Sequence, residues 1–262
     1  MTIYQDYQTG REEREAMSEV AIVIPARYGS GRFEGKPLAR ICGQTMIHHV
    51  FDRVCQVASE SSIFIATDDP RIAGEAGSFG ARCIMTGSHH SSGTSRIVEA
   101  MDSIDRELLI NVQGDEPLIH PQTITAVAVK LCQIEGPAMV TARVRITDEA
   151  LVADPNCVKV VVDREGRAMY FSRAAIPHRR TAAVPAVYGK HLGIYGYSAE
   201  TLRLWAGLER TTLEQLEDLE QLRFLENGVP VYVQDALHDS VGVDVPDDVE
   251  RVERALRGLQ RD

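Results

Sequence analysis

A group of cations between residues 27 and 36 offers the first chemistry in this sequence. Arg27, Arg32 and Lys36 alternate there with glycines, in the stretch RYGSGRFEGK. Glycines let main-chain N–H groups approach a ligand closely, and three cations can hold a polyanion such as a triphosphate. A solvated surface loop is the alternative interpretation. The position directly after the apolar run Ala21–Ile24 favours a phosphate site, because such sites form where a buried strand ends.

Two aspartates follow apolar strands elsewhere in the chain. Asp115 stands in NVQGDEP after the run Leu108–Val112, and Asp244 stands in GVDVP. Mg²⁺ prefers carboxylate and phosphate oxygens, so two carboxylates beside a phosphate-binding loop predict a phosphoryl-transfer site. Taken alone, the Asp115 segment is better explained as the start of a helix, because two prolines follow it closely. Together with the cationic loop, however, the two aspartates favour the interpretation as a metal site.

The polar stretch SHHSSGTSR, Ser88–Arg96, contains two adjacent histidines. Two histidines suggest metal ligands, but no third soft ligand stands nearby in the sequence, and Mg²⁺ disfavours imidazole. We therefore interpret this stretch as a loop that enters a helix. Its hydroxyl and N–H groups would bind a base or a phosphate.

The order of elements in the first half of the chain predicts a parallel sheet. Short apolar runs indicate strands, and apolar residues at helical spacing indicate helices between them. The predicted strands are 21–24, 62–67, 82–85, 108–112 and 138–144, and the predicted helices are 45–58, 71–79, 93–103 and 121–134. This alternation is typical of a doubly wound, Rossmann-like α/β fold with a mostly parallel sheet.

The second half of the chain begins differently. Val158–Val162 and Ala168–Phe171, joined by a turn, predict a β-hairpin, and Leu192–Tyr197 predicts a further strand. We assign these strands to a small β-rich insertion at about residues 140–195. The remaining predicted elements are a charged helix at 213–226, a strand at 231–234 and a final helix at 246–259.

The composition is that of an acidic globular protein. The chain has 262 residues and a formal net charge of −10, which disfavours nucleic acid as a partner. Five scattered cysteines without a CxxC pair predict buried, reduced thiols, as in the cytoplasm. No apolar run approaches the ~20 residues that span a membrane. We expect residues 1–19 to be a mobile extension and residues 20–262 to form a single domain.

Seven motifs together resemble one enzyme family. They are IPARYGSGRFEGKPL, SSGTSR, NVQGDEP, YFSRAAIP, KHLGIYGY, LEDLEQLRFLENG and GVDVPDD. In this order they resemble the CMP-sugar-acid synthetases, and most closely 3-deoxy-manno-octulosonate cytidylyltransferase of lipopolysaccharide biosynthesis. The resemblance implies a nucleotide-diphospho-sugar transferase fold, Mg²⁺ as cofactor and transfer of CMP from CTP to a sugar acid. It also implies a homodimer, for which the insertion is the candidate interface.

The resemblance assigns roles to individual residues. The predicted nucleotide-binding residues are Ala26, Arg27, Arg32, Lys36, Ser92, Gly93 and Thr94. The predicted acceptor-binding residues are Gln113, Arg173, His191, Tyr195, Glu220 and Gln221. Lys36, Arg27 and Asp115 would carry catalysis, while Asp115 and Asp244 would hold Mg²⁺.

Departures from the family pattern leave the acceptor open. The family often has proline where Glu34 stands and arginine where Lys190 stands. Phosphonoformate, the acceptor of similar enzymes in phosphonate antibiotic pathways, is therefore an alternative to the sugar acid. A nucleotide-binding regulator without turnover is a second alternative. It is disfavoured because Lys36, Asp115 and Asp244 are all present.

Overall fold

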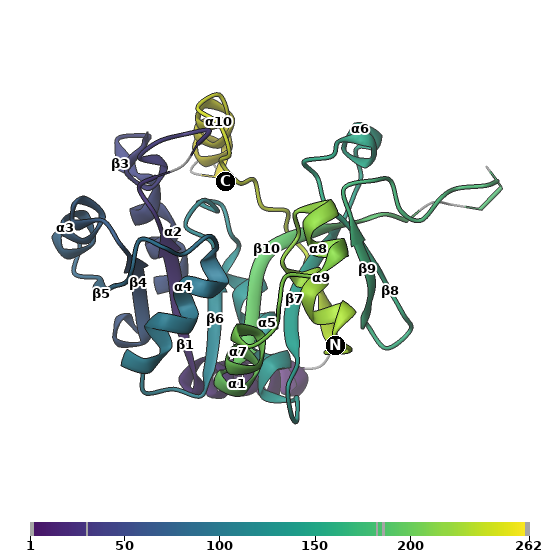
Figure 1. Cartoon of the computed structure of the whole chain (residues 1–262), viewed down its shortest axis with the longest axis horizontal. Helices are drawn as coiled ribbons and strands as arrows, with labels where there is room; N and C mark the ends of the chain where they lie inside the picture. Colours follow the sequence, from purple (N-terminus) through teal and green to yellow (C-terminus); the bar gives the residue numbers. More distant parts are fainter. Residues whose placement is uncertain (1–2, 30, 182, 185–186, 260–262) are drawn as a thin grey trace.

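The computed structural model describes residues 3–29, 31–181, 183–184 and 187–259. A sheet of nine strands runs through this described chain, and helices cover both of its faces (Figure 1). The strands of the sheet are β1 (Val20–Ala26), β4 (Ile63–Thr67), β5 (Arg82–Met85), β6 (Leu108–Val112), β7 (Met139–Arg145), β8 (Lys159–Val162), β9 (Ala168–Ser172), β10 (Gly189–Ser198) and β11 (Val231–Asp235). A separate hairpin consists of β2 (Arg40–Ile41) and β3 (Gln44–Thr45).

The strand order confirms the predicted fold class. The main path of the sheet is β11-β7-β10-β6-β1-β4-β5, and β8 and β9 are attached beside β10. The pairs β1–β4, β1–β6, β4–β5 and β11–β7 are parallel, whereas β10 is antiparallel to β6 and β7. Strands β1 and β6 therefore end at the same edge of the sheet, which is where doubly wound proteins bind ligands.

Each face of the sheet is covered by its own helices. The α-helices are α1 (Ile3–Glu19), α2 (Met46–Cys55), α3 (Pro70–Ser78), α4 (Gly93–Ala100), α5 (Pro121–Cys132), α6 (Glu149–Ala153), α7 (Ala199–Ala206), α8 (Thr212–Glu217), α9 (Gln221–Glu226) and α10 (Asp248–Leu259), and the 3₁₀ helices are η1 (Lys36–Leu38), η2 (Glu60–Ser62) and η3 (Met101–Ser103). Alternate residues of a strand face opposite sides. Thus Ile22 and Ile24 join a core with α1, α2, α3 and α5, while Ala21 and Val23 join another with α4, α7 and α9.

The predicted β-rich insertion is smaller than expected. We assigned residues of about 140–195 to it, but β7 and β10 are full members of the main sheet, with β10 between β6 and β7. Of the described strands between residues 140 and 195, only β8 and β9 lie off the main path of the sheet (Figure 1). Alternation of apolar residues reports which face of a strand is buried and not which strand it pairs with, so the pattern could not reveal this placement.

The prediction of a single helix at residues 213–226 is wrong. Two helices, α8 and α9, occupy the segment, and Asp218 between them has a left-handed backbone with φ of 51°. The first strand also differs, because β1 continues through Pro25 to Ala26. Pro25 is aligned with Ala66 of β4, whereas the pairing of β1 with β6 ends at Val23. Pro25 therefore has a paired strand on one side only, a position that tolerates the missing N–H of proline.

The N-terminal helix corrects a further expectation. We predicted a mobile extension over residues 1–19, but α1 packs against α5, and its Ala16 and Met17 are buried in the core. Both apolar side chains lie near the end of the segment. The prediction rested on the polar composition of residues 1–19 as a whole, in which these two residues count for little. That residues 20–262 form one domain stays a prediction.

The prediction of buried cysteines holds only for Cys157. Cys42, Cys83 and Cys132 are exposed, Cys55 is half-buried, and all five thiols are free. Cys55 and Cys132 are the last residues of α2 and α5, and Cys83 lies on the edge strand β5, so each is at the margin of an apolar element. No helix among the described residues has both the length and the apolar character that a membrane span requires.

Candidate active site

Lys36 lies between two carboxylates at the edge where β1 and β6 end. Its Nζ donates to Asp115 Oδ2 at 2.5 Å and to the Val243 carbonyl at 2.9 Å, and it lies 3.8 Å from Asp244 Oδ1. Arg32 also reaches Asp244, with 3.2 Å between Nη2 and Oδ1. The structure thus brings the cationic loop and both aspartates together, although they are far apart in the sequence.

Two glycines let the loops approach each other. Gly35 has φ of 68°, a conformation that favours glycine, and its N–H donates to the Tyr28 carbonyl at 2.8 Å, which turns the chain into η1. A Cβ on Gly114 would lie 2.8 Å from the Pro25 carbonyl oxygen. The loop after β6 can therefore cross the end of β1 only because residue 114 is glycine.

The segment that precedes α10 positions Asp244. The Val243 N–H donates to the Asp115 carbonyl at 2.9 Å, which joins the two aspartate segments. The Asp248 carboxylate accepts from the Asp244 N–H at 2.9 Å. Val243 and Val252 are buried in a small third core that anchors α10, at the end of the molecule opposite α1 (Figure 1).

A cavity of about 200 Å³, the smaller cavity, opens over the cationic loop. Six predicted nucleotide-binding residues line it: Ala26, Arg27, Arg32, Lys36, Ser92 and Gly93. The seventh, Thr94, does not line it, because its side chain is buried and hydrogen-bonded to Glu220. Ser92 caps α4 through its Oγ, which accepts from the Ser95 N–H at 3.2 Å, and this fixes one wall of the cavity.

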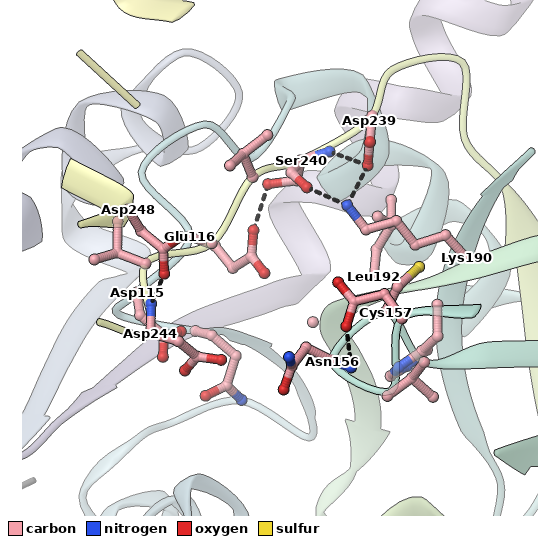
Figure 2. A pocket seen from close by; sticks show the side chains of 18 of the residues that line it. Asp115, Glu116, Asn156, Cys157, Lys190, Leu192, Asp239, Ser240, Asp244 and Asp248 are labelled. Carbon is pink, nitrogen blue, oxygen red and sulfur yellow. Dashed lines mark hydrogen bonds and ion pairs between the residues drawn. The ribbon is translucent and has the colours of Figure 1, made fainter. Parts of the chain in front are cut away.

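A second cavity of about 530 Å³, the larger cavity, adjoins the first. Figure 2 shows Asp115 and Asp244 on one side of it, with Lys190 and Asp239 on the other. The two cavities share four lining residues: Arg32, Gln113, Asp115 and Asp244. A ligand in each cavity would therefore meet at the paired aspartates.

Two residues of the larger cavity were missed as site residues in the sequence. Burial and the charge of Asp115 raise the pKa of the Glu116 carboxyl to about 7, and this carboxyl accepts a hydrogen bond from the Ser240 hydroxyl (Figure 2). Lys190 Nζ donates to Asp239 Oδ1 and to the Ser240 carbonyl, both at 2.7 Å. Glu116 stands beside Asp115 in NVQGDEP, and that adjacency was a usable signal.

Two predicted acceptor-binding residues, Gln113 and His191, line the larger cavity. Gln113 Nε2 donates to Asn111 Oδ1 at 3.1 Å, which orients the amide. Burial lowers the pKa of the His191 imidazole to about 3, so the ring is neutral. Its Nε2 lies 3.0 Å from Thr141 Oγ1 and hydrogen-bonds to that hydroxyl.

Arg173, another predicted acceptor-binding residue, does not line the larger cavity. Its guanidinium donates to three main-chain carbonyls: Glu217 at 2.7 Å, Pro155 at 3.1 Å and Asp218 at 3.3 Å. Carbonyls that no regular element satisfies need donors, and an arginine with five N–H groups supplies several at once. In this structure Arg173 ties the β8–β9 hairpin to the end of α8.

The other three predicted acceptor residues, all within the described chain, also lie outside the larger cavity. Tyr195 packs against His191, with 5.5 Å between ring centroids, and burial raises its pKa. Glu220 lines a third cavity of about 180 Å³. Burial raises the pKa of its carboxyl, although hydrogen bonds from Ser92 and Thr94 act in the opposite direction. Gln221 is buried, and its Nε2 lacks a hydrogen-bond partner in the structure.

The donor set at Lys36 fits a divalent metal ion. The Asp115 and Asp244 carboxylates already face one cation, the Lys36 ammonium group. Carboxylate oxygens are the ligands that hard dications prefer. A dication would therefore find two suitable ligands here and would compete with Lys36 for them.

Comparisons with known proteins agree with this architecture. Residues 21–235 match the family model described as cytidylyltransferase. A 3-deoxy-manno-octulosonate cytidylyltransferase of Syntrophotalea carbinolica is 48% identical over 92% of this chain and 99% of its own length. An 8-amino-3,8-dideoxy-manno-octulosonate cytidylyltransferase of Shewanella halifaxensis is 46% identical over 90% of this chain and 98% of its own length.

A solved structure supports the same conclusion. CMP:2-keto-3-deoxy-manno-octonic acid synthetase, solved in complex with CTP, superposes with a TM-score of 0.85 at 39% identity, over 92% of this chain and 99% of its own. A cytidylyltransferase of Leptospira borgpetersenii, with a TM-score of 0.63 at 13% identity over 91% of this chain and 87% of its own, shares the fold. The predicted enzyme class is thereby confirmed: this chain belongs to the cytidylyltransferase family of nucleotidyltransferases.

Proposed function

We propose that this protein transfers CMP from CTP to 3-deoxy-manno-octulosonate and releases pyrophosphate. The observation that carries the proposal is the meeting of the two cavities at Arg32, Gln113, Asp115 and Asp244. A reaction between two substrates needs their reacting atoms side by side, and such positioning supplies much of the rate enhancement. Six relatives with 42–48% identity are named for 3-deoxy-manno-octulosonate and supply the acceptor, whereas two relatives with 46% identity are named for its 8-amino-3,8-dideoxy analogue.

The smaller cavity would take the nucleotide. Its cations Arg27, Arg32 and Lys36 suit a triphosphate, and an arginine fork can bind phosphate oxygens in pairs. The acceptor hydroxyl would attack the α-phosphorus from the side of the larger cavity, while pyrophosphate leaves towards the cations. In such transfers the protein contributes positioning and charge neutralisation, without a covalent enzyme intermediate.

Cytidylyltransferases use a divalent metal ion, and Mg²⁺ is the ion we assign to Asp115 and Asp244. Bound there, Mg²⁺ would neutralise charge on the transferred phosphoryl group. Lys36 would then be free to turn from the carboxylates to the phosphates. Arg32, which is more exposed, would hold the outer phosphate oxygens.

The larger cavity suits an eight-carbon acid better than phosphonoformate. Its volume of about 530 Å³ is ordinary for a ligand of that size, whereas phosphonoformate has a single carbon atom. Gln113, Glu116 and His191 offer donors and acceptors for hydroxyl groups, and Lys190 offers a charge for a carboxylate. A cytoplasmic location, a homodimer and a place in lipopolysaccharide biosynthesis belong to the same proposal.

Pyrophosphate release from CTP, measured with a panel of acceptors, tests the proposal. The panel consists of 3-deoxy-manno-octulosonate, its 8-amino-3,8-dideoxy analogue and phosphonoformate, each with Mg²⁺. We expect the highest kcat/KM with the first. A higher kcat/KM with the amino sugar or with phosphonoformate would identify that compound as the acceptor instead. CTP binding without pyrophosphate release for any acceptor would favour a regulator.

A further inference from the structure

Three side chains with metal-binding atoms converge beside α4. They are His89, His90 and Glu99, and their ligand atoms all lie within 4.8 Å of one another. The histidines belong to the loop before α4, and Glu99 lies near the end of that helix. The third ligand that the local sequence lacks is thus brought back to the histidines by the helix.

The surrounding chain holds this group in place. The Gly87 N–H donates to both carboxylate oxygens of Glu99, at 3.1 and 3.0 Å, which fixes the carboxylate plane. His90 Nε2 is hydrogen-bonded to Glu99 Oε2, and its side chain is only 7% exposed. The rings of His89 and His90 lie side by side, with centroids 4.2 Å apart. A Cβ on residue 87 would overlap the His89 ring, so glycine is what admits that ring.

The charges around the group leave its carboxylate available. Arg96, on the same helix, donates to Thr86 Oγ1 and to the Gly87 carbonyl and pairs with Asp68 at 3.4 Å. Its guanidinium is therefore committed to other partners.

We propose that His89, His90 and Glu99 form a binding site for one first-row transition-metal dication, for which Zn²⁺ is the representative. Two imidazoles and a carboxylate are a donor set that zinc uses in proteins, with bonds near 2 Å. Imidazole ligands separate this site from Asp115 and Asp244, whose oxygen-only donors suit Mg²⁺. Three protein ligands leave a coordination position for water.

The ion would fasten one wall of the smaller cavity. The site lies at residues 89 and 90, and the next two residues, Ser91 and Ser92, line that cavity. The Ser91 carbonyl also accepts from Arg27 Nη1 at 3.5 Å. A metal that bridges the loop and α4 would therefore stabilise the segment that leads directly into the cavity.

Calorimetric titration with Zn²⁺ tests this site. The full-length protein is first stripped of metal and then titrated in a buffer with excess Mg²⁺. Mg²⁺ occupies the oxygen ligands, so the zinc heat reports the imidazole site. We expect one Zn²⁺ per chain, and a dissociation constant at least 10- to 100-fold higher in His89→Ala and Glu99→Gln, by analogy with second-shell losses of that size. Glu99→Gln keeps an amide oxygen that can accept from the Gly87 N–H.

The matched control is His238→Ala. His238 and His120 form another histidine pair, with ring centroids 3.7 Å apart, and no group of three ligands includes them among the described residues. This variant should bind zinc as the wild type does. Zinc should raise the thermal midpoint of the wild type and of His238→Ala, and leave that of Glu99→Gln unchanged.

Two results would overturn the site. One is a wild-type protein that binds no Zn²⁺ in excess Mg²⁺. The other is equal zinc affinity in the wild type, His89→Ala and Glu99→Gln, which would move the bound ion elsewhere. Circular dichroism identifies a variant that has failed to fold. If one does, the remaining variant decides, because His89 and Glu99 are both exposed and lie in different segments.

Discussion

At the scale of single residues, the position of Lys36 between two carboxylates has a measurable consequence. Its ammonium group competes with a metal ion for Asp115 and Asp244. We expect Lys36→Met to lower kcat/KM by roughly 10²- to 10³-fold, the size of losing one charge-stabilising group. The nucleotide-free variant should also bind Mg²⁺ more tightly than the wild type, because the competing cation is gone.

Isothermal titration with Mg²⁺ and pyrophosphate release measure both effects. Lys130→Met is the control, because Lys130 lies over the Tyr232 ring, 4.8 Å from its centroid, and lines neither cavity. This control should change neither quantity. Weaker Mg²⁺ binding in Lys36→Met would contradict the competition and assign Lys36 to holding the site together.

The two aspartates should matter more for turnover than for folding. Asp115 and Asp244 are 32% and 52% exposed, so their removal leaves no large cavity. We expect Asp115→Asn and Asp244→Asn each to lower kcat by about 10²-fold or more, with a thermal midpoint close to that of the wild type. Asp235→Asn, at an exposed pair with Arg143, is the control. Loss of folding in both site variants, judged by circular dichroism, would indicate a structural role.

The buried His191 imidazole should make the free energy of unfolding depend on pH, in a direction that its lowered pKa determines. Burial lowers the pKa of the folded-state imidazole to about 3, whereas an unfolded histidine has a pKa near 6.5. Between these values the unfolded chain binds a proton that the folded chain does not. The free energy of unfolding should therefore fall as pH falls below about 6.5, by up to about 1.4 kcal/mol per pH unit from this group.

Urea unfolding of the wild type and of His191→Gln between pH 7 and pH 4.5 isolates that contribution, because other groups cancel in the difference. The variant should lose stability less steeply on acidification. Glu116 acts in the opposite direction: its raised pKa means that the folded chain binds the extra proton, which adds stability as pH falls through 7. Parallel curves for the two proteins would show that His191 titrates normally.

At the scale of elements, the sequence predicts local structure well and pairing poorly. The strand Leu108–Val112 is found at its predicted bounds, because an apolar run of that length is buried on both sides of a parallel sheet. The break at Asp218 was missed, since a charged helical pattern continues through it. The place of β10 between β6 and β7 depends on partners distant in sequence, and no local pattern encodes them.

The crossing of the β6 loop over β1 depends on one glycine. A Cβ at residue 114 would press on the Pro25 carbonyl oxygen, a main-chain atom that cannot rotate away. Gly114→Ala should therefore displace the Asp115 loop, with a loss of about 1–3 kcal/mol in the free energy of unfolding and a lower kcat. Crowding of this kind shifts the backbone and not merely a side chain.

Gly74→Ala is the matched control for this substitution. Gly74 lies inside α3, and nothing stands within 4 Å of a Cβ built there, so alanine should be neutral or slightly stabilising. Urea unfolding and pyrophosphate release provide the two readouts. Wild-type stability and turnover in Gly114→Ala would mean that the loop has room to move without cost to the site.

At the scale of the whole molecule, the site combines segments that the sequence keeps far apart. Motif order identified Lys36, Asp115 and Asp244 as one group, and the fold places them within contact of one another. Glu116 and Lys190 were missed because the larger cavity exists only once β10 and the segment before α10 lie side by side. The contacts of Arg173 could not be predicted for the converse reason, since its partners are main-chain carbonyls that a sequence does not display.

The exposed apolar side chains beside the sheet bear on the expected homodimer. Met169 on β9 is 66% exposed, and Val184 and Val187 in the following segment are 60% and 59% exposed. Burial of such side chains against a second chain would remove apolar surface from water, which is favourable. We therefore expect two chains to associate through the β8–β9 hairpin and the segment after it.

Sedimentation equilibrium measures the association directly. The wild type should have twice the chain mass, and Met169→Asp together with Val187→Asp should yield monomers, because charges in an apolar contact lose their hydration without gaining partners. Leu216→Asp is the control: Leu216 lies on α8 and is 77% exposed, so it tests apolar exposure outside the hairpin. Dissociation by Leu216→Asp but not by the hairpin variant would move the interface to α8. A wild-type monomer at micromolar concentration would contradict the dimer itself, and the two cavities, both formed within one chain, would then suffice for turnover.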